Sequence, residues 1–240
     1  MPGPASPEIV VRPVVDPDEL QACVRLYEET FHLGPGDGSL NTRLLVGIVR
    51  NSGLVVGAFA ATEMVGFTLS FLARDPGGYL YQYSQLAVVA EGFQGLGIGR
   101  RLKLAQRGAT LAMGVDQIRW SFDPFLVRNA HFNLSVLRAR AVALERDMYG
   151  THGHGLDAPL STDRLLAVWD LASTAPSDNA GAEETLEVPA TASRQLDAAR
   201  RDERRRLLDA FEGLFDQGYV AVRCDLVDAA TARYRFSRVA

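Results

Sequence analysis

The chain has 240 residues, of which 47% are apolar and 22% are charged, and its formal net charge is -4. This composition predicts a soluble globular protein of one large domain, or of a domain with a small extension, without a general attraction to nucleic acid or to anionic membranes. The start "MPGPASPEIVV" does not resemble a signal peptide, no apolar run reaches the roughly 18 residues of a membrane span, and Cys23 and Cys224 are the only cysteines, so we expect a cytoplasmic protein without a disulfide framework.

The first half of the chain alternates between strand and helix patterns. The valine-rich segment "EIVVRPVV" predicts a first strand, and Asp16, Pro17 and Asp18 are typical of a helix start. The predicted elements are, in order, a strand at 8–15, helices at 16–31 and 41–51, and strands at 54–60, 65–73 and 78–90. The segment "ATEM" predicts a hairpin, so we expect an antiparallel meander followed by a crossover.

The second half of the chain predicts that crossover and then a separate C-terminal segment. The expected elements are a helix from 98 to 113, a strand at 118–122, a helix around 128–137, a strand at 164–172, a helix near 195–216, and strands at 218–226 and 232–239. The polar stretch "STAPSDNAGAEE" is typical of a linker. We therefore expect a core at 1–171, a linker at 172–186 and a small C-terminal α/β extension at 187–240. Asp202 and Glu203 interrupt the basic run at 200–206, which predicts a solvated helix surface rather than a nucleic-acid site.

Three glycines alternate with apolar residues where the strand at 78–90 ends, in "FQGLGIGRRLKLAQRG". The dinucleotide motif G-x-G-x-x-G fails because Arg100 takes the third glycine position, and the Gly-Lys-Ser/Thr of a P-loop is absent. The pattern that fits is Q-x-x-G-x-G, formed by Gln94, Gly97 and Gly99. Glycines let the backbone approach a ligand, and the N–H groups at a helix start attract an anion. The turn predicts a pyrophosphate site with Arg100 and Arg101 beside it, and a tight turn in which the glycines serve packing is the alternative.

The stretch "LAVVAEGFQGLGIGRRL" resembles the acyl-CoA signature of the GNAT superfamily of acyltransferases, and the order of the elements predicted over residues 8–171 is similar to that fold. "WSFDPFLVRNAHFNLSVL", with the later "YG" and "TDRLLAVW", resembles a branch of the family that reads W-[ST]-F-D-P, then N-A, then F-N-L. The resemblance implies an α+β fold in α/β/α layers, with a mixed, mostly antiparallel sheet that is splayed at the acyl-CoA site. It also implies transfer of an acyl group from acetyl-CoA, or from another acyl-CoA, to an amine without a metal ion.

The resemblance further implies which residues contact the coenzyme. The strand end at Ala87, Val88 and Val89 would pair with the pantetheine arm through its backbone, and an N–H group near Val89 would polarise the acyl carbonyl. Asn129 and Asn133 are candidate contacts on the following helix, and for Asn129 a helix cap is the alternative. The expected coenzyme contacts are Ala87, Val88, Val89, Gln94, Gly95, Leu96, Gly97, Ile98, Gly99, Arg100, Arg101, Asn129 and Asn133.

The sequence departs from the family at the residue that protonates the leaving thiolate. Many members use a tyrosine on the helix after the splayed strand, but here the alignment puts Leu134 at that position and Arg138 where a glycine is usual. Leucine cannot donate a proton, so either another residue does so or the thiolate leaves without help. The candidates are Tyr149, Ser84 and Asn133. An ordinary half-buried tyrosine and a solvated strand serine are the alternatives for the first two.

Other polar residues near these motifs favour structural roles. Asp123 precedes Pro124 and is expected to form an Asx turn at the end of its strand, rather than to act as a base. His131 is expected to be exposed or packed on its helix. No carboxylate or cysteine completes a metal site with His152 and His154, so we expect a loop there and no metal.

Two classes of function remain. The leading hypothesis is an acyl-CoA-dependent N-acyltransferase that moves an acetyl or succinyl group to the amine of a small molecule, such as an amino acid, by direct attack on the bound thioester. A succinyl donor would need a cation, for which Arg119 and Arg128 are candidates. The alternative is a non-catalytic acyl-CoA sensor, which the missing tyrosine supports. The expected partners are a coenzyme A thioester and a small amine, without nucleic acid or membrane, and the C-terminal extension is compatible with a homodimer.

Overall fold

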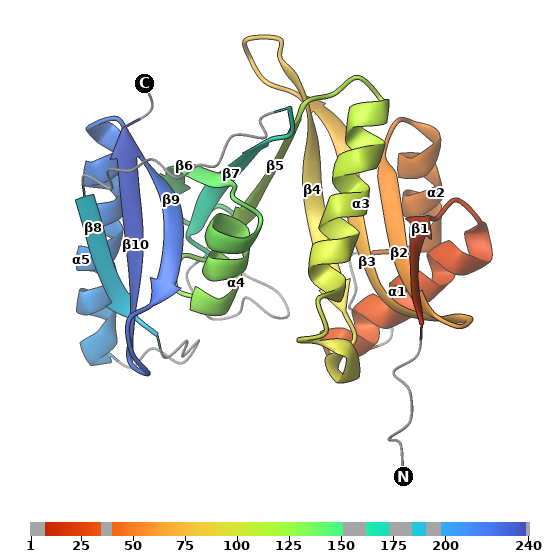
Figure 1. Ribbon diagram of the computed structural model, residues 1–240, viewed down its shortest axis with the longest axis horizontal. Helices are drawn as coiled ribbons and strands as arrows, with labels where there is room; N and C mark the ends of the chain where they lie inside the picture. The colour runs from red at the N-terminus through yellow and green to blue at the C-terminus, as the bar shows by residue number, and fades with distance from the viewer. Residues whose placement is uncertain (1–7, 35–39, 151–161, 173–183, 191–197, 239–240) are drawn as a thin grey trace. The chain divides into compact units, whose positions relative to one another are not determined.

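The computed structural model of the chain describes residues 8–34, 40–150, 162–172, 184–190 and 198–238. The chain divides into two compact units, Met1–Ile118 and Arg119–Ala240, and each is described by itself below (Figure 1). Of the helices described in these ranges, none is long and apolar enough to cross a membrane.

The first unit is built on an antiparallel sheet whose strands follow chain order. The strands are β1 (Ile9–Pro13), β2 (Leu54–Ala60), β3 (Glu63–Arg74) and β4 (Leu80–Val89). Each strand pairs with the next one, so that Ile9 lies opposite Ala60 and Ser70 lies opposite Ser84. The predicted antiparallel meander is confirmed, including the hairpin between β2 and β3.

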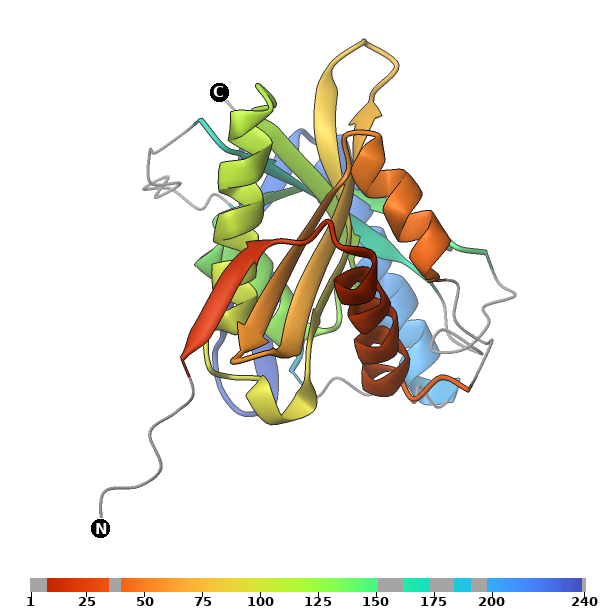
Figure 2. The same cartoon turned by 90° about the vertical axis from the view of Figure 1, so that its right-hand side faces the viewer.

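Helices pack on both faces of this sheet. They are α1 (Pro17–Thr30), α2 (Thr42–Arg50) and α3 (Ile98–Ala112), and a short 3₁₀ helix, η1 (Glu91–Phe93), precedes α3. Val55 belongs to the apolar cluster under α1 and α2, whereas its neighbour Val56 belongs to the cluster that contains Ile98 and Leu102 of α3. Successive strand residues point to opposite faces, so this unit has α/β/α layers. Figure 2 shows the strands of this unit between α3 on the left and α1 and α2 on the right.

Local side chains start the first two helices. The carboxylate of Asp16 accepts hydrogen bonds from the backbone N–H groups of Asp18 and Glu19, and Asn41 accepts one from Leu44. These caps satisfy N–H groups that lack a partner within the helix, which is why the helix starts could be predicted from the sequence.

The second unit contains β7, α5 and the C-terminal strands. Its elements are β5 (Gln117–Phe122, which begins before the boundary), α4 (Val127–His131), a π-helical turn η2 (Phe132–Val136), β6 (Arg140–Glu145), β7 (Arg164–Asp170), β8 (Glu184–Pro189), α5 (Ala198–Asp216), β9 (Tyr219–Leu226) and β10 (Thr231–Arg238). The strand order is β5-β7-β6-β9-β10-β8. The pairs β6–β7, β6–β9, β9–β10 and β10–β8 are antiparallel. The predicted α+β class with a mostly antiparallel sheet is therefore confirmed.

The helix α5 packs on its unit through an aromatic core. The Phe211 ring on α5 lies 5.0 Å from the Tyr234 ring and 6.0 Å from the Phe236 ring, between centroids. The hydroxyl of Tyr234 donates a 2.6 Å hydrogen bond to the carbonyl of Pro124. These three aromatic residues are fully buried, so the C-terminal segment shares a core with the β5–α4 connection.

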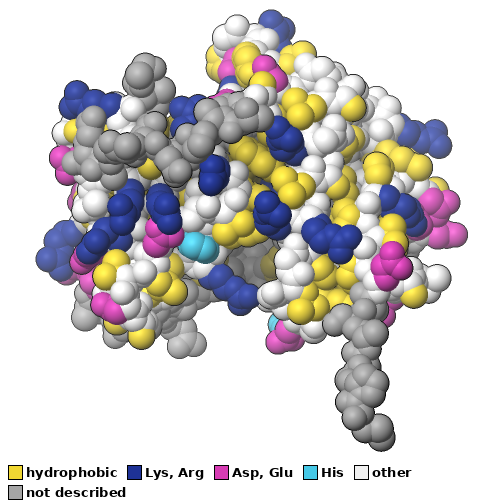
Figure 3. Space-filling model, viewed as in Figure 1, with side chains coloured by type: hydrophobic (Ala, Val, Ile, Leu, Met, Phe, Trp, Pro, Cys, Tyr) yellow, Lys and Arg dark blue, Asp and Glu magenta, His cyan; other side chains and the backbone are white. Residues whose placement is uncertain are grey.

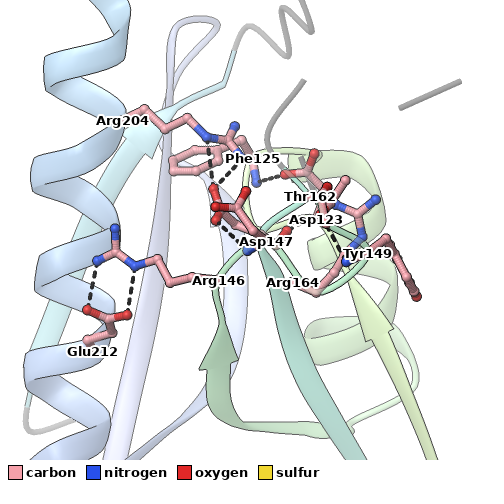
Figure 4. A network of polar contacts seen from close by, with 11 residues as sticks. Asp123, Phe125, Arg146, Asp147, Tyr149, Thr162, Arg164, Arg204 and Glu212 are labelled. Carbon is pink, nitrogen blue, oxygen red and sulfur yellow. Dashed lines mark hydrogen bonds and ion pairs between the residues drawn. The ribbon is translucent and has the colours of Figure 1, made fainter. Parts of the chain in front are cut away.

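Ion pairs join α5 to the rest of the same unit. The Arg204 guanidinium binds the Asp163 carboxylate at 3.0 Å, and their side chains are only 13% and 3% exposed. Arg204 also lies 4.5 Å from the centre of the Phe125 ring, and Arg146 binds Glu212 at 2.7 Å (Figure 4). The prediction of a solvated surface for the basic run is therefore wrong for Arg204, which its ion pair with Asp163 keeps against the unit.

The strand β6 was not predicted from the sequence. Its residues "RAVALE" favour a helix by local propensity. They form a strand because β7 pairs along one edge, and Ala141 pairs with Ala221 of β9 on the other. The strand β8 begins at Glu184, inside the predicted linker at 172–186. The division into a core at 1–171 and an extension at 187–240 stays a prediction, as does the splaying of the sheet.

Candidate functional site

The turn between β4 and α3 leaves backbone N–H groups open. After Val89 and η1, Gly95 and Gly97 both have left-handed backbone, with φ of 78° and 76°. Gly97 is the N-cap of α3 and provides no side chain to satisfy the first N–H groups of that helix. A Cβ built on Gly97 would meet no protein atom within 4 Å, so its positive φ, and not packing, requires glycine. This geometry suits an anion at the start of α3.

At the end of β4, the backbone N–H and C=O groups of successive residues point alternately to the two edges of the strand. Ala90 donates its N–H to the carbonyl of Val65 at 2.9 Å, so the N–H groups of Ala87 and Val89 point away from β3. The carbonyl of Val89 points the same way, and it accepts a 3.1 Å hydrogen bond from the side-chain nitrogen of Gln94. Gln94 therefore ties the turn to the end of the strand.

A β-bulge in β4 lies just before Ala87 and Val89 in the chain. Leu69 pairs with Leu86, but the next residue, Ser70, pairs with Ser84, which leaves Gln85 as an extra residue in β4. Bulges change the direction of a strand and occur often beside functional sites. The bulge sets the path of the residues that were expected to contact the coenzyme arm.

The side chains of the expected coenzyme residues differ in exposure. Leu96 is 62% exposed, whereas Ile98, the first residue of α3, is 2% exposed and packs in the apolar cluster with Val56 and Leu102. Arg100 is exposed. Arg101 is exposed as well, but its guanidinium donates a 2.6 Å hydrogen bond to the carbonyl of Ile9 on β1. Arg100 is therefore the better placed of the two arginines to meet a phosphate.

A buried lysine on α3 was missed by sequence reasoning. Lys103 is 3% exposed, and its amine donates to Ser84 Oγ at 2.8 Å and to Gln106 Oε1 at 3.2 Å. Burial lowers the pKa of this amine from 10.5 to about 7. Among the 25 Lys and Arg residues of the chain, Lys103 is the only lysine. That was the available signal, because lysine can be buried as a neutral amine and arginine cannot be deprotonated.

Two of the three proton-donor candidates are buried. Ser84 is 6% exposed and its hydroxyl is engaged by Lys103, so it faces α3 and is not the solvated serine of the alternative prediction. Asn133 is 3% exposed, and its side chain donates to Asn129 at 3.4 Å. Each of these polar groups therefore already has a partner inside its own unit.

Tyr149 is the accessible one of the three candidates. It is 48% exposed, and its hydroxyl lies 3.0 Å from Ser121 Oγ. The guanidinium of Arg164 lies 5.3 Å from the centre of the Tyr149 ring. The backbone N–H of Tyr149 donates a hydrogen bond to Thr162 Oγ1 at 3.0 Å (Figure 4). The residue is thus held by its neighbours while much of its side chain stays open to solvent.

The helix after β5 corrects one alternative and locates the two residues, Leu134 and Arg138, at which the sequence differs from the pattern that it resembles. Leu126 is the N-cap of α4 and Asn129 lies inside the helix, so Asn129 is not its cap. Leu134, which stands in the position of the family's tyrosine, is 1% exposed. Arg138, in the position of the family's glycine, has a φ of 61°. The backbone there still adopts the left-handed conformation that favours glycine.

Asp123 and His131 have structural partners. Asp123 Oδ1 accepts a 2.8 Å hydrogen bond from the N–H of Phe125, which confirms the predicted Asx turn. His131 Nδ1 lies 2.8 Å from the carbonyl of Cys224 and 3.2 Å from Asp225 Oδ1, so it joins α4 to β9. Both contacts fit the structural roles that the sequence favoured.

In the part of the chain that the structure describes, no group of three or more His, Cys, Asp or Glu side chains is arranged to hold a metal ion. His152 and His154 lie outside the described residues. Both cysteines are buried free thiols, and burial raises the pKa of each to about 12.

A cavity of about 440 Å³ lies beside the glycine turn within the first unit. Its walls include Glu29 and His32 near the end of α1, together with Ala90, Glu91 and Gln94 from the connection between β4 and α3. Two carboxylates, those of Glu29 and Glu91, and the imidazole of His32 belong to its lining.

Comparison with known proteins places the fold. No protein-family model matches the chain, and no curated protein matches it. A GNAT-family protein from Desulfovibrio desulfuricans is matched over 69% of this chain and 100% of its own, with a TM-score of 0.54 and 16% identity. The ribosomal-protein-S18-alanine N-acetyltransferase of Escherichia coli is matched over 71% of this chain and 98% of its own, with a TM-score of 0.54 and 14% identity. Arabidopsis thaliana NAA60, solved with a bisubstrate analogue, is matched over 68% and 98%, with a TM-score of 0.54 and 15% identity. The chain therefore has the fold of the GNAT acetyltransferases.

Proposed function

We propose that this protein is an acyl-CoA-dependent N-acyltransferase that transfers an acetyl or succinyl group to the amine of a small molecule. The observation that carries the proposal is the β4–α3 turn, where left-handed Gly95 and Gly97 precede an uncapped helix start. The turn lies on a fold whose solved examples include named N-acetyltransferases. The Q-x-x-G-x-G spacing of the turn adds sequence support that is independent of the fold.

The coenzyme would bind along the turn and the strand before it. In this proposal the pyrophosphate accepts hydrogen bonds from the backbone of residues 94–99, and exposed Arg100 adds positive charge. The pantetheine arm pairs with the edge of β4 to which the N–H groups of Ala87 and Val89 point. An N–H group at this edge would then polarise the thioester carbonyl, as oxyanion donors do.

The reaction would be a direct transfer. The neutral amine attacks the carbonyl carbon of the thioester, the new C–N bond forms, and the C–S bond breaks to release the thiolate of coenzyme A. The amine loses one proton and the thiolate gains one. Among the three candidates for the second proton transfer, the exposure of Tyr149 favours it over Ser84 and Asn133, because the polar groups of the other two are buried against protein partners.

The cavity beside the turn is our candidate for the acceptor site. Its carboxylates, Glu29 and Glu91, would attract the protonated form of an amine. A bound ammonium must lose a proton before it attacks, and a carboxylate or His32 in the cavity wall would take it. This assignment favours small cationic acceptors over anionic ones.

Calorimetric titration with coenzyme A tests the coenzyme site. Asparagine tolerates the left-handed backbone, so Gly97→Asn should fold while its side chain obstructs the approach of the pyrophosphate, and we expect affinity to fall by well over tenfold. The matched control is Gly108→Ala, at an exposed glycine on the same helix where a Cβ meets nothing within 4 Å. Equal affinity in folded Gly97→Asn and in the control would overturn the assignment of the turn.

Release of free thiol from acetyl-CoA or succinyl-CoA with a panel of amines tests the chemistry. Turnover with cationic small amines is the expected result. The buried Leu134 in place of the family's tyrosine keeps the sensor as a second candidate. Tight coenzyme binding without thiol release from any amine would establish the sensor instead of the enzyme.

A further inference from the structure

A seam of buried polar side chains lies between α3 and the sheet of the first unit. Its members are Thr68, Ser70, Gln82, Ser84, Lys103, Gln106 and Thr110. On α3 they are three and four residues apart, which puts them on one face, and Ser70 lies directly opposite Ser84 in the sheet. Thr68 Oγ1, Ser70 Oγ, Gln82 Oε1 and Thr110 Oγ1 have no hydrogen-bond partner within the described structure. Such a seam lowers stability, because these atoms lose their hydrogen bonds to water on folding.

Within this seam, Lys103 and Gln106 of α3 form hydrogen bonds to Ser84 of β4. The Lys103 amine donates to Ser84 Oγ at 2.8 Å, and Gln106 Nε2 donates to the same oxygen at 3.2 Å. Ser84 is the residue next to Gln85, the extra residue of the β-bulge. The contact therefore joins the second turn of α3 to β4 at the point where β4 changes direction.

Side-chain hydrogen bonds at three successive places connect the glycine turn and its helix to the sheet. Gln94 binds the carbonyl of Val89 before α3, Arg101 binds the carbonyl of Ile9 at the first turn, and Lys103 binds Ser84 at the second. The first two bonds are made by exposed side chains. The bonds that Lys103 and Gln106 donate to Ser84 are buried, and buried hydrogen bonds constrain geometry more strongly than solvated ones.

The presence of a lysine at position 103 is a second observation that points to a functional role. Apart from the four histidines, every other basic side chain in the chain is an arginine, and Lys and Arg side chains are spread over the face shown in Figure 3. An apolar residue such as methionine would fill the same space without the loss of hydration. The one lysine therefore stands at a position where its burial lowers stability, as happens at functional sites.

We propose that Lys103 is a positioning residue for the coenzyme site, whose hydrogen bond to Ser84 fixes α3 against β4 and so sets the turn at residues 94–99 relative to the strand edge at Ala87 and Val89. The inference rests on the proposed coenzyme site. It adds to that proposal a residue that touches neither the coenzyme nor the reacting atoms.

The burial of Lys103 also makes the affinity of the proposed coenzyme site dependent on pH. Burial lowers the pKa of the Lys103 amine to about 7, so its charge changes near neutrality. On the elements packed against α3, β2 has no titratable side chain, and Glu63 and Arg74 lie at the exposed ends of β3. The other charged or titratable groups on these elements are Arg12, Tyr81, Tyr83, Arg100, Arg101 and Arg107. The two acceptors, Ser84 Oγ and Gln106 Oε1, are neutral oxygens.

Two variants of α3 separate positioning from stability. Lys103→Met keeps the length of the side chain and removes the hydrogen bond, whereas Thr110→Val removes a polar atom from the same seam that has no partner in the described structure. We expect Lys103→Met to bind coenzyme A about tenfold more weakly, the loss that one hydrogen bond supplies, and Thr110→Val to bind as the wild type does. In turnover the KM for the acyl-CoA should rise while kcat changes little.

The wild-type affinity for coenzyme A, measured between about pH 6 and 9, should show an inflection near pH 7 that Lys103→Met lacks. Since Lys103 is the only lysine, 13C labelling at lysine Cε gives a single signal that follows its charge directly. Addition of coenzyme A should shift this signal in the wild type.

The outcomes distinguish this inference from the function on which it rests. Normal wild-type binding together with equal affinity in folded Lys103→Met, or with an unmoved lysine signal, would overturn the positioning role alone. Absence of coenzyme A binding by the wild type would overturn both. A tenfold loss in Lys103→Met with none in Thr110→Val would support the role, since a seam that matters only for stability predicts equal affinities.

Discussion

Replacing Lys103 by methionine should change how stability depends on pH. Burial lowers the pKa of the Lys103 amine to about 7 in the folded protein, while the unfolded chain keeps a value near 10.5. Between these values the unfolded chain binds a proton that the folded protein does not, so the free energy of unfolding rises with pH. Below about pH 7 both states are protonated, and the loss of stability from the buried charge is complete. Lys103→Met has no such titration.

The expected size follows from the same values. The gap between 10.5 and about 7 corresponds to about 5 kcal/mol lost at low pH. Raising the pH from about 6 to 9 recovers roughly 2–3 kcal/mol of this loss. Methionine forfeits the hydrogen bonds to Ser84 and Gln106, at about 1 kcal/mol each. The variant should therefore be more stable than the wild type by roughly 2–3 kcal/mol near pH 6, and the two should be about equally stable near pH 9.

Urea unfolding of both proteins across this range measures the difference directly. Cys23 and Cys224, whose pKa values burial raises to about 12, lower stability at high pH in both proteins, so the difference curve cancels them. Parallel curves for the two proteins would refute the reasoning, because they would mean that Lys103 titrates alike in the folded and unfolded states. A variant that is less stable than the wild type near pH 6 would also refute it. That result would mean that the charged amine gains more stabilisation in the folded protein than hydrogen bonds to Ser84 and Gln106 provide.

Three further changes test other parts of the structure. Arg138→Gly should stabilise the protein by up to about 1 kcal/mol, because glycine relieves a left-handed φ of 61° and loses some of that gain to chain entropy; urea unfolding checks this, and a destabilised variant would contradict it. Arg204→Met should destabilise by about 3–5 kcal/mol in the same assay, since the Asp163 side chain is 3% exposed and would lose its cationic partner; a loss below about 1 kcal/mol would mean that the pair is unimportant. Tyr149→Phe should lower kcat roughly a hundredfold and leave coenzyme A affinity unchanged, and full turnover in a thiol-release assay would exclude Tyr149 as the proton donor.

The elements that depend on neighbouring residues were predictable from the sequence. Asp16 and Asn41 cap their helices through backbone groups two or three residues away, and alternation in the first half gave the meander. The glycine turn between β4 and α3 was likewise predictable, because its conformation depends on residues close together in the chain. Its left-handed residues, Gly95 and Gly97, are a property of the backbone that no other residue adopts as readily.

Tertiary structure decided the elements and groups whose partners are far along the chain. The strand β6 is formed by pairing with β7 and β9, against its local propensity. Arg204 belongs to a run that predicts a solvated helix, and its partner Asp163 is 41 residues away. Local patterns cannot identify such partners, because the contact energy depends on distance in space and not on distance along the chain.

The same distinction applies to the candidate site. The sequence by itself predicted the turn before α3, since spaced glycines favour the left-handed backbone that Gly95 and Gly97 adopt. It presented Ser84 as a solvated strand residue or a proton donor and passed over Lys103. Only the packing of α3 on β4 brought these two together, 19 residues apart, and buried both. Burial removes water from the amine and so lowers its pKa, and a linear sequence does not contain the local dielectric environment on which that shift depends.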